Sequence, residues 1–145
     1  MKLYAIADLH LGHPTNREAL HRLSPHPEDW LILAGDVAET EDRLDAAFTL
    51  LNQRFARLIW VPGNHELWTT SRVAGAARGE ARYRALVALA RARGVVTPED
   101  PYPIWPGDGR TVIAPLFLLY DYSFRPDTVA AADVLAWAGL QRCAD

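Results

Sequence analysis

Three short apolar runs, separated by longer segments, organise the first 65 residues of the chain. Residues 3–7, 30–34 and 58–61 are entirely apolar, which is typical of strands buried in a sheet. Each run is followed at once by an Asp, Gly or Pro that breaks the apolar pattern. Because segments with helical character separate the runs, we predict an α/β fold with a βαβαβ core and a mainly parallel first sheet.

Helical periodicity occupies the segments between and after these runs. Residues 16–23 can form a short helix, which is ended by the prolines that follow it. A second helix is predicted from apolar residues that recur every three or four positions. These residues are Leu44, Phe48, Leu51 and Phe55. Residues 78–93 predict a third helix, for which Gly94 is a fitting stop.

The last third of the chain has a less regular pattern. Residues 97–110 are rich in Pro, Gly and Asp and predict an irregular loop. Residues 112–120 predict a strand that Pro115 interrupts, and residues 133–140 predict a final helix. Since no repeat or linker divides the chain, we expect a single domain over residues 1–145.

Composition narrows the class of protein. The chain has 145 residues, 50% of them hydrophobic and 23% charged, which excludes a disordered protein. No apolar run approaches the roughly 20 residues that a membrane-spanning helix needs. Asp8 and His10 fall where a signal peptide would need its apolar stretch, and Cys143 is the only cysteine. We therefore expect a cytoplasmic protein without an internal disulfide and without membrane contact.

The charge balance bears on the substrate. A net charge of −3 provides no overall attraction to nucleic acid, so a nucleic-acid partner is not indicated. A negatively charged substrate would need a local positive centre, which a bound metal ion can supply.

Each of the three predicted strands leads into residues that can bind metals. They are Asp8 and His10, then Gly35-Asp36, then Gly63-Asn64-His65-Glu66. Because ligands gather at the carboxyl ends of parallel strands, we expect these side chains to converge. Singly, each fragment is typical of a turn or a helix cap, but three in succession predict a functional site. The mixture of nitrogen and oxygen donors suits Mn²⁺, Fe or Zn²⁺.

The order Asp-x-His, Gly-Asp, Gly-Asn-His-Glu resembles the signature of the calcineurin-like metallophosphoesterases. This resemblance implies an α-β-β-α sandwich and two divalent metal ions, with Mn²⁺ as our first expectation and Fe, Zn²⁺ or Mg²⁺ as alternatives. It implies that Asp8, His10 and Asp36 bind one metal, and that Asp36 and Asn64 bind the other. It also implies that His65 faces the substrate and acts catalytically, either on the leaving group or on the transition-state charge.

The resemblance further implies hydrolysis of a phosphomonoester or phosphodiester by a hydroxide that two metals activate. The substrate would be a phosphorylated molecule whose class the sequence does not identify. His13, close to the first motif, is a candidate for contact with the substrate phosphate. Glu39 and Glu66 are candidates for orienting a ligand or capping a turn.

The chain departs from the family pattern after His65, because it contains no later histidine. The family completes its site with such histidines, so we expect a domain truncated on its C-terminal side and an incomplete sandwich. Two alternatives to the phosphoesterase hypothesis follow. The chain can be a catalytically incomplete fragment that binds at most one metal or serves as a binding module. It can also self-associate through its unfinished sheet.

Overall fold

The computed structural model describes residues 1–68, 76–118, 123 and 125–141, and its sheet is the predicted parallel one. Three strands, β1 (Leu3–Ile6), β2 (His26–Ala34) and β3 (Phe55–Val61), lie in the order β1-β2-β3. Both pairings are parallel. The α/β class and the parallel first sheet are thus confirmed.

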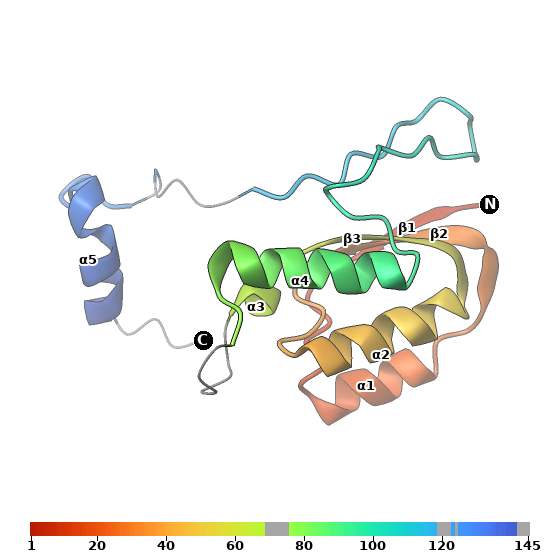
Figure 1. Cartoon of the computed structure of the whole chain (residues 1–145), viewed down its shortest axis with the longest axis horizontal. Helices are drawn as coiled ribbons and strands as arrows, with labels where there is room; N and C mark the ends of the chain where they lie inside the picture. The colour runs from red at the N-terminus through yellow and green to blue at the C-terminus, as the bar shows by residue number, and fades with distance from the viewer. Residues whose placement is uncertain (69–75, 119–122, 124, 142–145) are drawn as a thin grey trace.

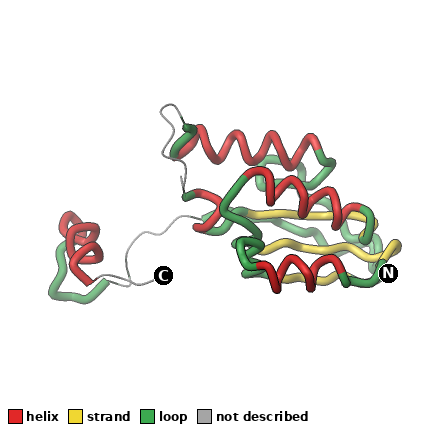
Figure 2. The backbone as a smooth tube through the Cα atoms, turned by 90° about the horizontal axis from the view of Figure 1, so that it is seen from below, coloured by secondary structure: helices red, strands yellow, loops and turns green. Residues whose placement is uncertain are grey.

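The helices on the sheet are α1 (Pro14–His21), α2 (Glu41–Asn52) and α4 (Gly79–Ala92), and Figure 1 shows them on one side of the strands. A single turn, α3 (Asn64–Leu67), follows β3. A 3₁₀ turn at Ala131–Asp133 leads into α5 (Val134–Gln141), which stands apart from the sheet (Figures 1 and 2). No helix in the described ranges is long and apolar enough to cross a membrane.

Period-two alternation in the strands divides the core between the two faces of the sheet. On the helical face, Leu33, Leu58 and Trp60 are fully buried against α2 and α4. The opposite face carries a smaller cluster of Trp30, Ile59 and Val96, which Trp105 and Ile113 partly cover. Gly94 has a φ of +70° just beyond α4, so its predicted role as a helix stop is confirmed.

Two predicted elements differ from the structure. The strand predicted over 112–120 is absent from 113–118, and Val112 forms only an isolated bridge with Ile104. Pro115 lacks an N–H group, and no described strand lies beside this segment; residues 119–120 lie outside the described residues. Phe55 opens β3 instead of extending the helical stripe, because α2 ends at Asn52 and a tight turn follows.

The first strand is less buried than its apolar sequence predicts. Ala5 and Ile6 are exposed, because β1 is an edge strand with β2 as its sole described neighbour. The second sheet expected of a sandwich is likewise not formed by the described residues. In its place, the other face of the sheet carries only the irregular segment that includes Trp105 and Ile113.

Candidate metal centre

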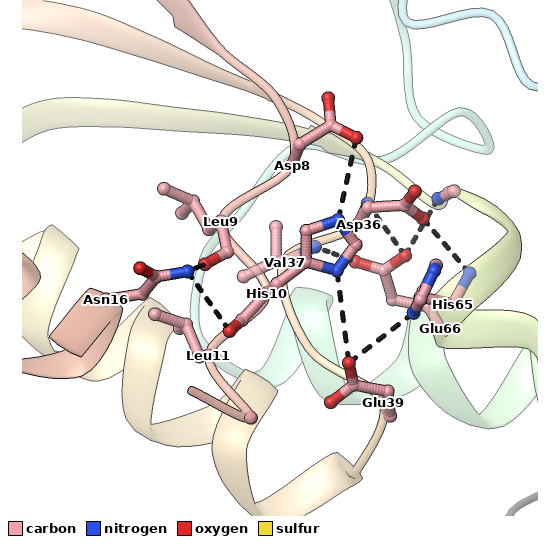
Figure 3. Close-up of polar contacts among 12 residues, drawn as sticks. Asp8, Leu9, His10, Leu11, Asn16, Asp36, Val37, Glu39, His65 and Glu66 are labelled. Carbon is pink, nitrogen blue, oxygen red and sulfur yellow. Dashed lines mark hydrogen bonds and ion pairs between the residues drawn. The ribbon is translucent and has the colours of Figure 1, made fainter. Parts of the chain in front are cut away.

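The loops that follow β1 and β2 run side by side at the carboxyl end of the sheet (Figure 3). The Asp8 amide donates to the Gly35 carbonyl at 3.1 Å, and the His10 amide donates to the Asp36 carbonyl at 2.9 Å. These bonds continue the parallel pairing of the strands into the loops. The first two motifs are therefore aligned by the register of β1 on β2.

Three residues of these loops adopt left-handed backbone conformations. Asp8, His10 and Asp36 have φ values of 58°, 41° and 54°. Asp and His enter this region more readily than most L-residues, yet each instance costs on the order of 1–3 kcal/mol. These backbone conformations reverse the chain direction just after β1 and β2, so the side chains there are directed toward a common point.

Two glycines allow the second and third motifs to approach closely. A Cβ atom on Gly63 would overlap the Asp36 carboxylate. A Cβ atom on Gly35 would lie 2.9 Å from the Gly63 backbone, and Gly35 also has a φ of +90°. Glycine at both positions is thus a condition for the contact between the two motifs.

Metal-capable donors from all three motifs meet at this point. His10, Asp36 and His65 are half-buried, and one donor atom of each lies within 4.8 Å of the others. The rings of His10 and His65 are 4.5 Å apart, and Nε2 of His10 is 3.7 Å from the exposed Asp8 carboxylate. A mixed imidazole and carboxylate set of this kind fits a divalent transition metal.

Glu39 lies between the two histidines. Its Oε1 is 3.4 Å from Nδ1 of His65 and 4.0 Å from Nδ1 of His10 (Figure 3). The His65 ring also packs on Trp68, with ring centroids 3.9 Å apart. The carboxylate and the indole together define the orientation of the His65 imidazole.

The Glu66 side chain links the second and third motifs through hydrogen bonds. It is completely buried, and it accepts hydrogen bonds from the amides of Asp36 (3.0 Å), Val37 (2.6 Å) and Gly63 (2.9 Å). Asp36 in turn accepts a bond from the His65 amide at 3.0 Å. The buried carboxylate therefore holds backbone in place instead of facing the metal-capable donors.

The other predicted residues lie nearby without a described side-chain partner. Asn64 is half-buried at the first position of α3, and His13 is the exposed residue that precedes α1. Arg82 of α4, which the sequence reasoning did not single out, is buried and donates to the backbone carbonyls of Glu66 and Glu39. Arg82 lies four residues before Leu86, so both are on the same face of the helix, and this spacing could have identified Arg82.

Comparisons with known proteins agree with this geometry. A family model described as calcineurin-like phosphoesterase matches residues 1–133. The chain belongs to this family. It is 54% identical over 127 residues to PptH, an [acyl-carrier-protein] phosphodiesterase from Mycobacterium tuberculosis. That alignment covers 86% of this chain but 39% of the relative.

A solved structure is also similar. The crystal structure of the phosphopantetheinyl hydrolase PptH from Mycobacterium tuberculosis matches with a TM-score of 0.86 and 48% identity. The match covers 99% of this chain and 52% of the solved one. The chain thus spans about half or less of the length of the relatives to which it is similar.

Proposed function

We propose that this chain carries the metal-binding part of a phosphodiesterase that acts on the phosphopantetheine group of an acyl carrier protein. The convergence of His10, Asp36 and His65 is the observation that carries the proposal, since it sets an imidazole and a carboxylate that could bind a cation beside a second imidazole at the end of a parallel sheet. The named activity of the relative, at 54% identity, supports the substrate class.

The residues present fit divalent metal ions. Asp8, His10 and Asp36 would hold one ion, and Asp36 with Asn64 would hold a second, with Mn²⁺ as the first candidate. When bound, such ions neutralise phosphoryl oxygens and lower the pKa of water. We place the reaction in the cytoplasm, because a single cysteine suits a reducing compartment.

His65 is the proposed proton donor. Hydrolysis adds water to phosphorus and breaks the bond from phosphorus to the oxygen of the carrier protein, which leaves with a proton. Glu39, 3.4 Å from Nδ1 of His65, would keep the other ring nitrogen directed to the leaving oxygen. Glu39 is thus a positioning residue in this proposal.

A second candidate function is a half-site that binds one metal without turnover. It is favoured by the donor geometry, because the described residues bring together one group of three acidic or histidine side chains.

Metal stoichiometry separates the two candidates. The purified chain is loaded with Mn²⁺, and the bound metal is counted by atomic emission. Two ions per chain, with release of phosphopantetheine from a carrier protein, are expected for the phosphodiesterase. One ion without release would identify the half-site. Asp36→Asn is expected to lose both ions, while Asp42→Asn, an exposed carboxylate on α2, keeps them.

The role of His65 is tested by His65→Gln. We expect turnover to fall by about 10²–10⁴-fold, the usual contribution of general acid catalysis, while the Mn²⁺ count is unchanged. The matched control is His21→Gln at the exposed end of α1, which should retain full activity. Loss of metal together with activity would show that His65 serves as a ligand.

A further inference from the structure

Arg82 is a buried cation near the start of α4, and it contacts the backbone on both sides of the candidate centre. Only 8% of its surface is exposed. Its Nε donates to the Glu66 carbonyl at 2.6 Å, and a terminal nitrogen donates to the Glu39 carbonyl at 2.9 Å. Because a guanidinium group is a rigid plane, these two bonds fix the distance between the two carbonyls.

A charged side chain at this position is costly if its only task is to pack α4 on the core. Leu86 and Ala90 lie on the same face of the helix and are buried apolar residues. Arg82 bonds mainly to neutral carbonyls, and its described carboxylate partner, the exposed Glu41, is 3.5 Å away. Burial of a charge with so little compensation is less favourable than burial of an apolar side chain. The two segments that Arg82 connects therefore account for it better than packing does.

Each of these segments carries one member of the pair formed by Glu39 and His65. Oε1 of Glu39 is 3.4 Å from Nδ1 of His65, and Glu66 directly follows His65 in α3. This Nδ1 atom is buried and has no hydrogen-bond partner among the residues that the structure describes. Since hydrogen bonds from N–H to oxygen span about 2.7–3.2 Å, the contact lies just beyond bonding distance. A small shift of either segment thus decides whether the bond forms.

We propose that Arg82 is a positioning residue that sets the separation between the Glu39 carboxylate and the His65 ring. It holds the carbonyl of Glu39 and the carbonyl of the residue after His65 on one rigid group, so the two segments cannot move apart freely. The start of α4 lies beside α3 (Figure 1), which places the guanidinium within reach of both. This inference rests on the proposed function, in which His65 is the proton donor.

The kinetic test uses Arg82→Lys in the full 145-residue chain loaded with Mn²⁺. Lysine keeps the positive charge, but a single ammonium group lacks the planar fork that holds both carbonyls. We expect kcat for release of phosphopantetheine from an acyl carrier protein to fall by about 10–10²-fold, the usual range for a small misplacement of a catalytic group. The KM and the Mn²⁺ count should stay unchanged, because Arg82 does not touch substrate or metal.

A double-variant comparison separates positioning from a general loss of stability. In the Glu39→Gln background, the carboxylate that Arg82 positions is already absent. Arg82→Lys should therefore lower kcat by less than about twofold there, since residues that act through one another are not additive. A purely structural role would lower kcat by the same factor in both backgrounds.

A second readout needs neither metal nor substrate. The ¹⁵N resonance of Nδ1 of His65 is recorded in the metal-free chain at a pH of about 8, where an ordinary imidazole is neutral. Arg82→Lys and Glu39→Gln should each move this resonance in the same direction, and the double variant should move it no further than Glu39→Gln alone. If the wild type releases no phosphopantetheine, the proposed function fails, and this resonance alone decides the role of Arg82.

The matched control is Arg84→Lys on the same helix. The Arg84 side chain is 57% exposed and pairs with Glu80 and Glu99, so its replacement should leave kcat and the His65 resonance unchanged. Three results would overturn the proposal. They are an equal loss of kcat in both backgrounds, a His65 resonance that Arg82→Lys does not move, and a chain that Arg82→Lys unfolds, which would make Arg82 a stability residue only.

Discussion

Asp8, His10 and Asp36 serve the candidate centre through both their side chains and their backbones. Each offers a metal-capable group and adopts a left-handed φ that Asp and His tolerate better than most residues. A substitution at these positions therefore changes the chemistry and the loop conformation together.

Gly63 provides the clearest single-residue prediction. Gly63→Ala places a methyl group where the Asp36 carboxylate lies, so we expect Mn²⁺ binding to fall at least about tenfold. Isothermal titration measures this loss. Gly79→Ala is the control, because no atom lies within 4 Å of the added Cβ, although Gly79, unlike Gly63, has a positive φ. The control should cost about 1 kcal/mol of stability without affecting metal binding. Equal metal affinity in both variants would contradict the steric argument.

Glu66 is predicted to act on stability. Glu66→Gln replaces a buried carboxylate that accepts from three amides by a group with one accepting oxygen. We expect the free energy of unfolding to fall by about 1–3 kcal/mol, measured by urea titration. Glu80→Gln on the exposed surface of α4 should change it by less than about 0.5 kcal/mol. Similar losses in the two variants would be inconsistent with the bonds described.

At this scale the sequence predicted which motifs lie together better than it predicted the residues that support them. Asp8, His10 and Asp36 follow recognisable strands, so their convergence could be anticipated from sheet geometry alone. Two of the three partners of Glu66 could not, because they are backbone amides about 30 residues away. The place of Glu39 beside both histidines depends in the same way on tertiary folding.

Among the elements, α4 carries a titratable group that reports on its packing. Burial and, second, the hydrogen bond from its hydroxyl to Glu99 together raise the pKa of Tyr83 to about 12, while Arg84 and Arg91 oppose the rise. The unfolded chain releases this proton near pH 10. Folding thus holds the proton more tightly than the unfolded state does, and this contribution to stability is present below pH 10 and is lost as pH rises to about 12.

The corresponding prediction concerns ultraviolet titration at about 295 nm, where tyrosinate absorbs. Tyr83→Phe should remove an absorbance step centred near pH 12 from the folded protein. The stability difference between the wild type and this variant should also shrink between pH 10 and 12. A missing step near pH 10 instead would show that the Tyr83 hydroxyl is not held as described.

The strands whose burial was predicted correctly are those with a neighbour on each side. The strands at 30–34 and 58–61 lie in the middle of the sheet or are covered at both edges, so their apolar runs and their burial agree. The run at 3–7 forms a strand but stays partly exposed, since burial depends on a neighbour beyond β1. The run at 112–120 needed a partner strand as well, and none is described beside it.

For the whole molecule, we expect most of the stability to come from the sheet and from the two apolar clusters that cover its faces. In the described residues, α5 packs mainly on the 3₁₀ turn before it (Figure 1). A chain ending at residue 130 should therefore keep its free energy of unfolding within about 0.5 kcal/mol. A chain ending at residue 102 loses Trp105 and Ile113 from the cluster on Trp30 and should lose about 1–3 kcal/mol. Urea unfolding compares the two, and equal losses would contradict this division.

Because the strand register aligns the two loops, metal binding at the proposed centre would depend on correct pairing of β1 with β2. Leu3 pairs with Trp30, and the same pairing brings Asp8 to Gly35 and His10 to Asp36. A slip of one residue would send Asp8 and His10 to the other face of the sheet. If the proposed centre binds Mn²⁺, the fraction of chains that take up the ion would therefore count the molecules whose first two strands have paired correctly.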